Sequence, residues 1–211
     1  KDSMKRTLIF VCFVVFASIK VDAQQTPQFS QNMFNKLANN PGFAGSMEAI
    51  CATALHRQQW IGFGDGRPVT TNLSVDAGIP AIYGGLGLNI VNETIGQYDN
   101  LGLQLSYAYR TELGNGQVGT GISLGMYQSS LDGSSLNPAN SGDPALPTAD
   151  AQGSALDLGF GIYYNNEDAY IGLSSSNITE PTIEWENATT QKLVRHYYLI
   201  SGYYYQVSNA I

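Results

Sequence analysis

His56 and His196 are the only histidines in the sequence, and histidine is the residue type best suited to act as a general base or a metal ligand near neutral pH. His56 stands next to Arg57, and His196 stands next to Arg195, in two segments far apart along the chain. Two histidines on distant strands do not make a site. We therefore interpret both as strand residues that face a polar interior or an interface.

Three other patterns could suggest chemistry. Glu184-Trp185-Glu186 offers two carboxylates, but it lies in a loop-like stretch with no partner acid, which favours a solvated loop. The glycine-rich run 83–87 precedes no helix, so it is not a phosphate cradle. Cys51 would be alone once a leader holding Cys12 is removed, which excludes an internal disulfide. We expect no catalytic residue, no cofactor, no metal site and no enzyme activity.

Residues 1–23 have the pattern of a secretory signal peptide. We place the start at Met4, with residues 1–3 upstream of it. Lys5 and Arg6 are followed by an apolar run over 8–19, and small side chains at 21–23 precede Gln24. The run is shorter than the roughly 20 apolar residues of a spanning helix. The alternative, a buried N-terminal helix, lacks an amphipathic pattern. The sequence predicts export, with the mature chain beginning at Gln24.

Composition restricts the class of protein. The formal net charge is −7, and no cluster of Lys and Arg is present, which argues against nucleic-acid binding. Charged residues make up 13% of the chain, well below the roughly 25% of an ordinary soluble domain. The 23 glycines and 13 tyrosines suit a protein whose outer face meets lipid and whose tyrosines lie at the membrane boundary. A secreted β-sandwich can have a similar composition.

Period-two alternation is the main structural signal. In 101–109, Leu and Tyr at odd positions share one face, while Gly102, Gln104, Ser106 and Ala108 share the other. Its length matches the roughly 9–11 residues of a tilted membrane strand. About eight such segments are countable, with boundaries that slip by a few residues. The others are 49–60, 71–79, 85–90, 118–126, 156–164, 169–175 and 195–207.

Short turns at 114–116 and 165–168 contrast with two long polar loops at 129–153 and 179–192. This arrangement is typical of an outer-membrane barrel. The sequence predicts an all-β transmembrane antiparallel β-barrel over 48–211, preceded by an irregular segment over 24–47 that packs on the periplasmic side or plugs the lumen. The last strand is followed by only Ser208–Ile211, without a terminal aromatic residue. We expect the C-terminal part of the barrel to be missing from this chain.

The segment 24–45, QQTPQFSQNMFNKLANNPGFAG, resembles the start of the mature PorP/SprF family of the type IX secretion and gliding apparatus of Bacteroidetes. Later stretches at 85–96, 161–181 and 195–203 resemble family strands. Asn32, Gly42 and Phe43 depart from the family pattern. The resemblance assigns structural or partner-contact roles to the matching positions. These are Pro27, Gln28, Phe29, Ser30, Gln31, Met33, Phe34, Asn35, Asn40, Pro41, Ala44, Gly45, Arg57, Gln59 and Trp60.

The resemblance implies an outer-membrane barrel that supports export or surface anchoring of adhesin-type proteins. Its implied partners are outer-membrane lipid, secreted adhesin-type proteins, and periplasmic secretion-machine or peptidoglycan-associated proteins. It supplies no catalytic residues. Two other readings remain open: an outer-membrane channel for small solutes, and a soluble β-sandwich that binds sugars.

Overall fold

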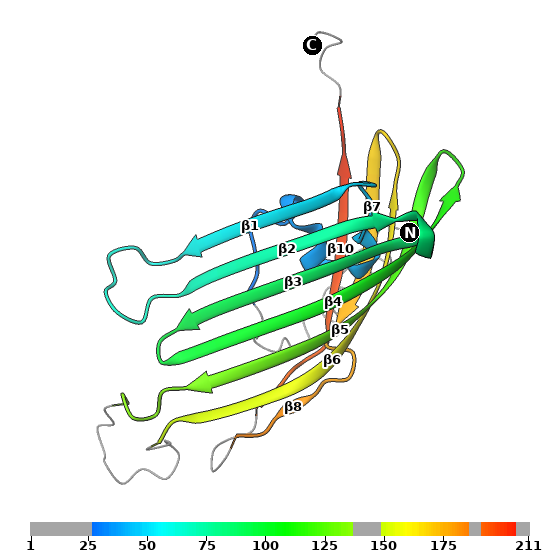
Figure 1. Ribbon diagram of the computed structural model, residues 1–211. Coiled ribbons are helices and arrows are strands. Elements are labelled where there is room, and N and C mark those ends of the chain that lie inside the picture. Colours follow the sequence, from blue (N-terminus) through cyan, green and yellow to red (C-terminus); the bar gives the residue numbers. More distant parts are fainter. Residues whose placement is uncertain (1–26, 137–148, 186–190, 206–211) are drawn as a thin grey trace, which may run out of the picture.

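A computed structural model describes residues 27–136, 149–185 and 191–205. The residues of the expected signal peptide, 1–23, lie outside the described ranges. The fold is almost entirely β-structure (Figure 1). Its strands are β1 (Ile50–Gln58), β2 (Val69–Ile79), β3 (Gly84–Ile95), β4 (Tyr98–Leu113), β5 (Gly116–Leu131), β6 (Ala151–Asn165), β7 (Ala169–Ser176), β8 (Thr182–Ile183), β9 (Gln191–Lys192) and β10 (His196–Tyr203). Its helices are single turns: η1 (Asn32–Phe34), α2 (Lys36–Asn39), η2 (Pro41–Phe43) and η3 (Pro80–Ile82).

Eight strands form one antiparallel sheet in the order β1-β2-β3-β4-β5-β6-β7-β10. The register is continuous from Ile50–Ala77 at one edge to Tyr203–Ala169 at the other. The sheet curls into a half-barrel with β1 and β10 as its edge strands (Figure 1). Within the described ranges, no helix is long and apolar enough to cross a membrane. The predicted all-β antiparallel barrel fold is confirmed.

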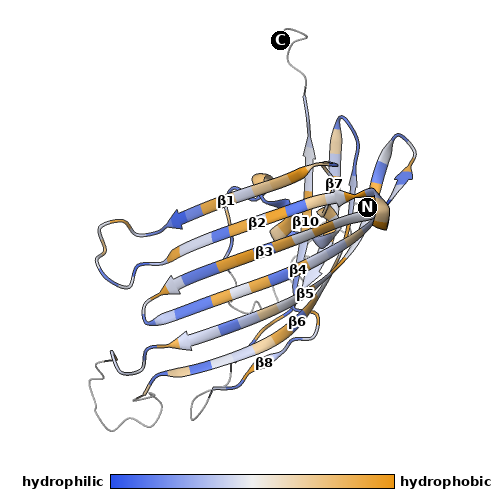
Figure 2. Ribbon diagram, viewed as in Figure 1, coloured by the Kyte–Doolittle hydropathy of each residue, from blue (hydrophilic) through white to orange (hydrophobic). Residues whose placement is uncertain are grey.

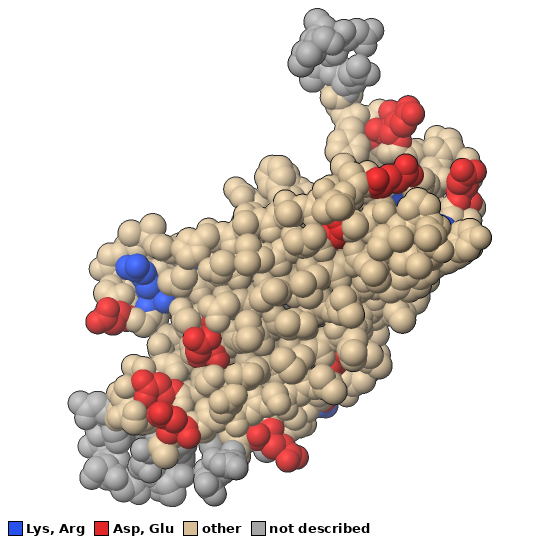
Figure 3. Space-filling view, viewed as in Figure 1, with Lys and Arg blue, Asp and Glu red and all other residues tan. Residues whose placement is uncertain are grey.

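The convex face of the sheet carries the large apolar side chains. On β4, Leu105 is 53% exposed, whereas its neighbour Ser106 is 1% exposed and points to the concave side. The same alternation holds on the partner strands, where Leu105 pairs with Leu88 and Leu124. Hydrophobic and hydrophilic stretches alternate along the strands (Figure 2), and most charged atoms on the face in view lie at the ends of the strands (Figure 3). The two faces that the alternation in 101–109 predicts are thus the convex and the concave face of β4.

The two ends of the sheet differ in their connections. The short-turn end contains the connections 80–83, 114–115 and 166–168. The long-loop end contains 59–68, 132–150 and 177–195, together with the tight turn at 96–97. The first predicted long loop is shorter than expected, because β5 and β6 extend to Leu131 and Ala151. The second connection is longer than expected, since it spans 177–195, and the short strands β8 and β9 pair within it.

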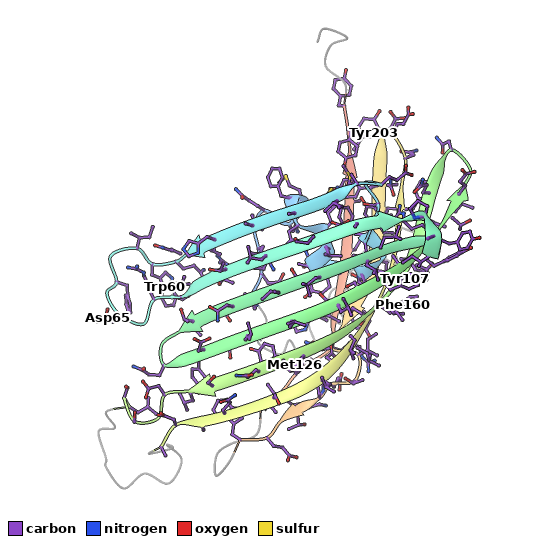
Figure 4. All side chains as sticks on the ribbon, in the orientation of Figure 1. Trp60, Asp65, Tyr107, Met126, Phe160 and Tyr203 are labelled. Atoms are coloured by element: carbon purple, nitrogen blue, oxygen red, sulfur yellow. The ribbon has the colours of Figure 1, made fainter. Side chains whose placement is uncertain are left out.

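Aromatic side chains lie near both ends of the sheet. Tyr107, Phe160 and Tyr203 lie toward the short-turn end, and Trp60 lies in the loop after β1 at the other end (Figure 4). The hydroxyl of Tyr107 donates to the carbonyl oxygen of Ile82 at 2.9 Å. Rings with a polar tip at two levels, separated by aliphatic side chains, are the arrangement found at the two interfaces of a membrane barrel.

Candidate functional site on the concave face

The concave face of the sheet is covered by residues 27–49, which we call the N-terminal segment. It folds as η1, α2 and η2, which are joined by the single residues Asn35 and Asn40. Asn40 starts η2: its side chain accepts a hydrogen bond from the Gly42 amide at 2.8 Å, and Pro41 occupies a first-turn position where it needs no donor. A chain of single turns without period-two alternation lies across strands rather than joining the sheet.

Glycines on the strands allow the backbone of this segment to approach the sheet. A Cβ atom at Gly121 would lie 2.4 Å from the Gly42 nitrogen, and one at Gly85 would lie 2.5 Å from the Gly45 Cα. A Cβ at Gly161 would meet the Asn40 side chain at 2.2 Å. A Cβ at Gly119 would lie 2.3 Å from the Gly42 carbonyl oxygen. Real Cβ atoms do not come so close, so only glycine at these four positions leaves room for the segment, and we call them the glycine track. The same residues appeared in the sequence only as the small positions of the alternation.

Polar side chains complete the contact. Ser74 donates to the Asn35 side-chain oxygen at 3.0 Å, and Asn35 also donates to Asn72. Asn72 in turn donates to Asn89 at 2.7 Å. Asn35 and Asn72 are 3% and 0% exposed, so these amides depend on one another for hydrogen bonds.

Two further contacts fix the second half of the segment. The Asn40 side chain donates to the carbonyl oxygen of Ile162 on β6 at 3.0 Å, and the Gly45 amide donates to the Asp76 carboxylate at 2.9 Å. Arg110 donates to the Gly42 carbonyl oxygen at 3.3 Å and to the Asn165 side chain at 2.8 Å. The segment is therefore bonded to β2, β4 and β6.

Lys36 binds the N-terminal segment to aromatic side chains near the short-turn end of the sheet. Its ammonium group lies 3.7 Å from the ring centroid of Tyr170 on β7 and donates to the Tyr204 hydroxyl at 3.0 Å. A cation held over an aromatic face is attracted by the negative face of the ring. Leu37, 1% exposed, packs with Ala44 and Ala108 to form the small apolar core of the interior.

In the structure, the residues expected from the family motif fall into buried, cavity-lining and exposed groups. Asn35, Asn40, Pro41, Ala44 and Gly45 are buried against the sheet. Pro27 and Phe29 line a cavity, and Arg57 donates to the carbonyl oxygen of Gln28. The rest lie at exposed or peripheral positions: Ser30, Gln31, Met33, Phe34, Gln59 and Trp60. Asn72, Asp76, Asn89 and Arg110 were not expected from the motif, although their inward positions in the alternation could have marked them.

The two histidines lie on different faces. His56 is on the convex side, where its ring nitrogens contact Thr71 and Gln58 at 3.0 Å each. His196 is on the concave side, near the Asn177 side chain at 3.4 Å. Within the described ranges, no group of three or more His, Cys, Asp or Glu residues could hold a metal ion. The structure does not bring the histidines together.

Trp185 is not a freely solvated loop residue. Its ring centroid lies 5.8 Å from that of Tyr98, and a Cβ at Gly153 would lie 2.6 Å from its Cδ1 atom. Glu184 beside it is exposed, and Glu186 lies outside the described ranges. Trp185 therefore packs the β8–β9 hairpin against the ends of neighbouring strands.

A curled antiparallel wall, apolar outside and polar inside, defines a membrane protein of the β-barrel class. Residues 21–211 match the family described as type IX secretion system membrane protein PorP/SprF, and the chain belongs to this family. It is thus a membrane component of type IX secretion, and the resemblance noted in the sequence is confirmed. No curated protein and no solved structure gives a significant match.

Proposed function

We propose that the protein is an outer-membrane component of the type IX secretion and gliding apparatus, and that it supports export or surface anchoring of adhesin-type proteins through protein–protein contacts. It reaches the outer membrane by means of the signal peptide expected over 1–23. Its role is non-enzymatic. Membership of the PorP/SprF family supports the assignment to the secretion apparatus.

The observation that favours protein contact over transport is the occupied concave face. A solute channel needs open, hydrated space along the inner wall. Here the N-terminal segment lies across that wall, in close contact with glycines of β3, β5 and β6. The side-chain amides of Asn35 and Asn40 are bonded to the wall rather than left for solute. Because the segment covers much of this wall, we assign partner contacts to the two ends of the barrel and to exposed side chains of the segment itself.

We assign the long-loop end to secreted partners and the short-turn end to periplasmic ones, following the usual orientation of outer-membrane barrels. The long-loop end offers exposed apolar side chains at Trp60, Ile61 and Phe63, which are 61%, 82% and 70% exposed. It also offers anionic groups. Hydrogen bonds from Ser135 and Ser134 hold the pKa of the Asp132 carboxyl below its usual value, so it is charged at neutral pH.

Within the family motif, we propose that the buried positions hold the N-terminal segment in place and that exposed Met33, Phe34 and Trp60 contact partners. Met33 and Phe34 are 56% and 64% exposed. An exposed large apolar side chain in the middle of a segment that is otherwise tightly packed is well placed for a protein contact.

A deletion strain tests the proposal. We expect it to lose adhesin-type proteins from the cell surface, and wild-type protein supplied in trans to restore them. Phe34→Ser should fold and insert normally but restore less surface adhesin, while Tyr205→Ser, a matched exposed aromatic outside the motif, should restore fully. Normal surface adhesins in the deletion strain would contradict the proposal.

The alternative function is a channel for small solutes, which the polar concave lining favours. Purified protein in planar bilayers separates the two. We expect no steady conductance from wild-type protein. Sustained single-channel steps in the wild type, unchanged in variants that loosen the N-terminal segment, would favour the channel.

A further inference from the structure

A cavity of about 140 Å³ remains on the concave face beside the N-terminal segment. It lies toward the long-loop end, since its walls come from Glu93 on β3, Gly102 on β4 and Tyr127 on β5, and Phe29 and Asn39 of the segment border it. Met126 also borders the cavity, and its label in Figure 4 shows where along β5 the cavity lies. The glycine track that receives the segment lies farther along the same strands, at Gly119 and Gly121.

At two glycine positions in the cavity wall, a larger residue would fit without a clash. A Cβ at Gly102 would lie no closer than 3.8 Å to any atom, and one at Gly125 no closer than 3.7 Å, which is ordinary contact. Both have negative φ, unlike the glycines of the turns. Glycine weakens a strand, and in a strand it often marks a place where a ligand approaches the backbone. Gly102 and Gly125 thus keep open a space that nothing in the described chain fills.

The charges lining this space have one sign. Glu93 and Asp157 both contribute to the wall, and among the residues that the structure describes no Lys, Arg or His lines it. Neither carboxylate forms an ion pair: across the described ranges the pair within 4 Å is Lys192 with Glu180. Arg57 acts electrostatically on Glu93 but binds the carbonyl oxygen of Gln28. Both carboxylates are held by neutral donors, Thr70 at 3.5 Å for Glu93, and the Asn177 amide at 2.8 Å for Asp157.

Aromatic groups complete the wall. Phe29, Tyr127 and Tyr198 all border the cavity. The Tyr127 hydroxyl is buried and has no hydrogen-bond partner, although buried hydroxyls are normally paired. Carboxylates together with aromatic rings form the environment that binds organic cations, through charge and through the ring faces. An anion would meet two carboxylates with no compensating base.

We propose that this cavity binds a small organic cation, an amine or guanidinium group on a short apolar stem, with Glu93 and Asp157 as its counter-ions and the aromatic rings around its stem. The group could come from a free amine or from a basic side chain of a polypeptide, since both present the same chemistry. The proposal does not depend on the secretion function proposed above.

Calorimetry on the detergent-purified full chain tests this. The probes are pentylamine, N-acetyl-lysine N-methylamide and, as an uncharged match, N-acetyl-norleucine N-methylamide. We expect both amines to bind and the norleucine derivative to bind at least tenfold more weakly. Equal affinity of the two amines would identify the amine end as what is recognised, whereas tighter binding of the lysine derivative would identify a polypeptide source.

Variants locate the site. Glu93→Gln and Asp157→Asn each remove one charge with little change of shape and should weaken amine binding about tenfold, in line with loss of a charged hydrogen bond. Gly102→Leu should fill the space and abolish binding, and Gly125→Ala, a smaller change, should weaken it. Asp65→Asn makes the same charge change in the loop after β1, and it should leave the affinity unchanged.

Three results would overturn the proposal: no binding of either amine, equal binding of the norleucine derivative, or unchanged binding in Glu93→Gln and Asp157→Asn. Binding of N-acetylglucosamine in place of the amines would assign the cavity to a neutral sugar and would also overturn it. Far-UV circular dichroism of each variant confirms that the sheet has formed, so that lost binding reports on the cavity.

Discussion

The convex and concave faces are built from the same strands, yet the two faces meet different requirements. On the convex face, Leu103, Leu105 and Leu124 are 37%, 53% and 53% exposed, and Leu105 and Leu124 are partners in the register of β4 and β5. On the concave face, Asn72, Asn89 and Ala108 are nearly or fully buried, and the two asparagine side chains are hydrogen-bonded to each other. The outer face therefore requires apolar character, whereas the inner face requires fitted shapes and paired hydrogen bonds.

The largest expected effect contrasts neighbouring residues on the two faces of β4. Leu105→Arg should lower the free energy of unfolding by about 2–4 kcal/mol if position 105 lies near the bilayer midplane. Gln104→Arg should cost much less, because the concave side is polar and can hydrate the guanidinium group. Urea titration of the protein folded into lipid vesicles measures both. Equal costs would mean that position 105 does not face lipid.

A labelling experiment tests the same contrast in protein whose native Cys51 has been replaced. Cysteine at position 105 should react with a lipid-phase probe, and cysteine at position 104 should react with a small aqueous reagent. If position 105 is labelled from water in monodisperse protein without detergent, the membrane assignment of this face is wrong.

The next effect contrasts two glycines on the same face of β5. Gly121→Val should lower the free energy of unfolding by about 1–3 kcal/mol, because its Cβ would lie 2.4 Å from the backbone of Pro41 and Gly42. Gly125→Val should be neutral or stabilising, since its Cβ has only ordinary contacts at 3.7 Å and beyond. Limited proteolysis should detect release of the N-terminal segment only in Gly121→Val. Comparable stability of the two variants would show that the segment does not press on this strand.

A smaller effect concerns the buried amides. Asn72→Leu should lower the free energy of unfolding by about 1–2 kcal/mol, because it leaves Asn35 and Asn89 without a shared partner. Thr71→Leu, on the opposite face of the same strand, should be tolerated. Urea titrations of the two variants, run side by side, measure the difference. A larger cost for Thr71→Leu than for Asn72→Leu would reverse the assignment of the two faces.

The smallest effect concerns Lys36. Lys36→Met keeps the length of the side chain but removes the cation over Tyr170, and it should cost about 0.5–1 kcal/mol. The loss should show as faster hydrogen exchange in 36–39 with unchanged exchange in β4 and β5. Lys192→Met, which removes a cation exposed near Glu180, is the matched control and should leave exchange in 36–39 unchanged.

The sheet could be predicted from the sequence, because a wall between lipid and a polar interior must alternate at every residue. Leu101–Tyr109 shows this rule directly, and it lies within β4. Strand β1 is harder to recognise, since Ile50 is followed on the convex face by Ala52, Ala54, His56 and Gln58 rather than by further large apolar residues. Small and polar side chains on the outer face weaken the alternation that identifies a strand.

The contacts of the N-terminal segment could not be predicted in this way. Asn40 bonds to Ile162, which lies 122 residues later, and Arg110 reaches Gly42 across 68 residues. The period of the apolar pattern and the residues of the turns are local signals. They do not indicate which distant part of the backbone packs against a given glycine. The cavity beside the segment was equally hidden, because Gly102 and Gly125 look the same in the sequence as Gly119 and Gly121.

The placement of Lys36 and Asn40 also sets an order of events during assembly. Both residues precede all strands of the described ranges, yet their contacts lie on β6, β7 and the residue following β10. Such long-range contacts cannot form until the intervening strands have folded. The entropy cost of closing these long loops is therefore offset by favourable contacts only late in folding. Docking of the segment is therefore expected to be the final and slow step of folding. During refolding into vesicles, a brief protease pulse should still cut the segment after the strands have become resistant.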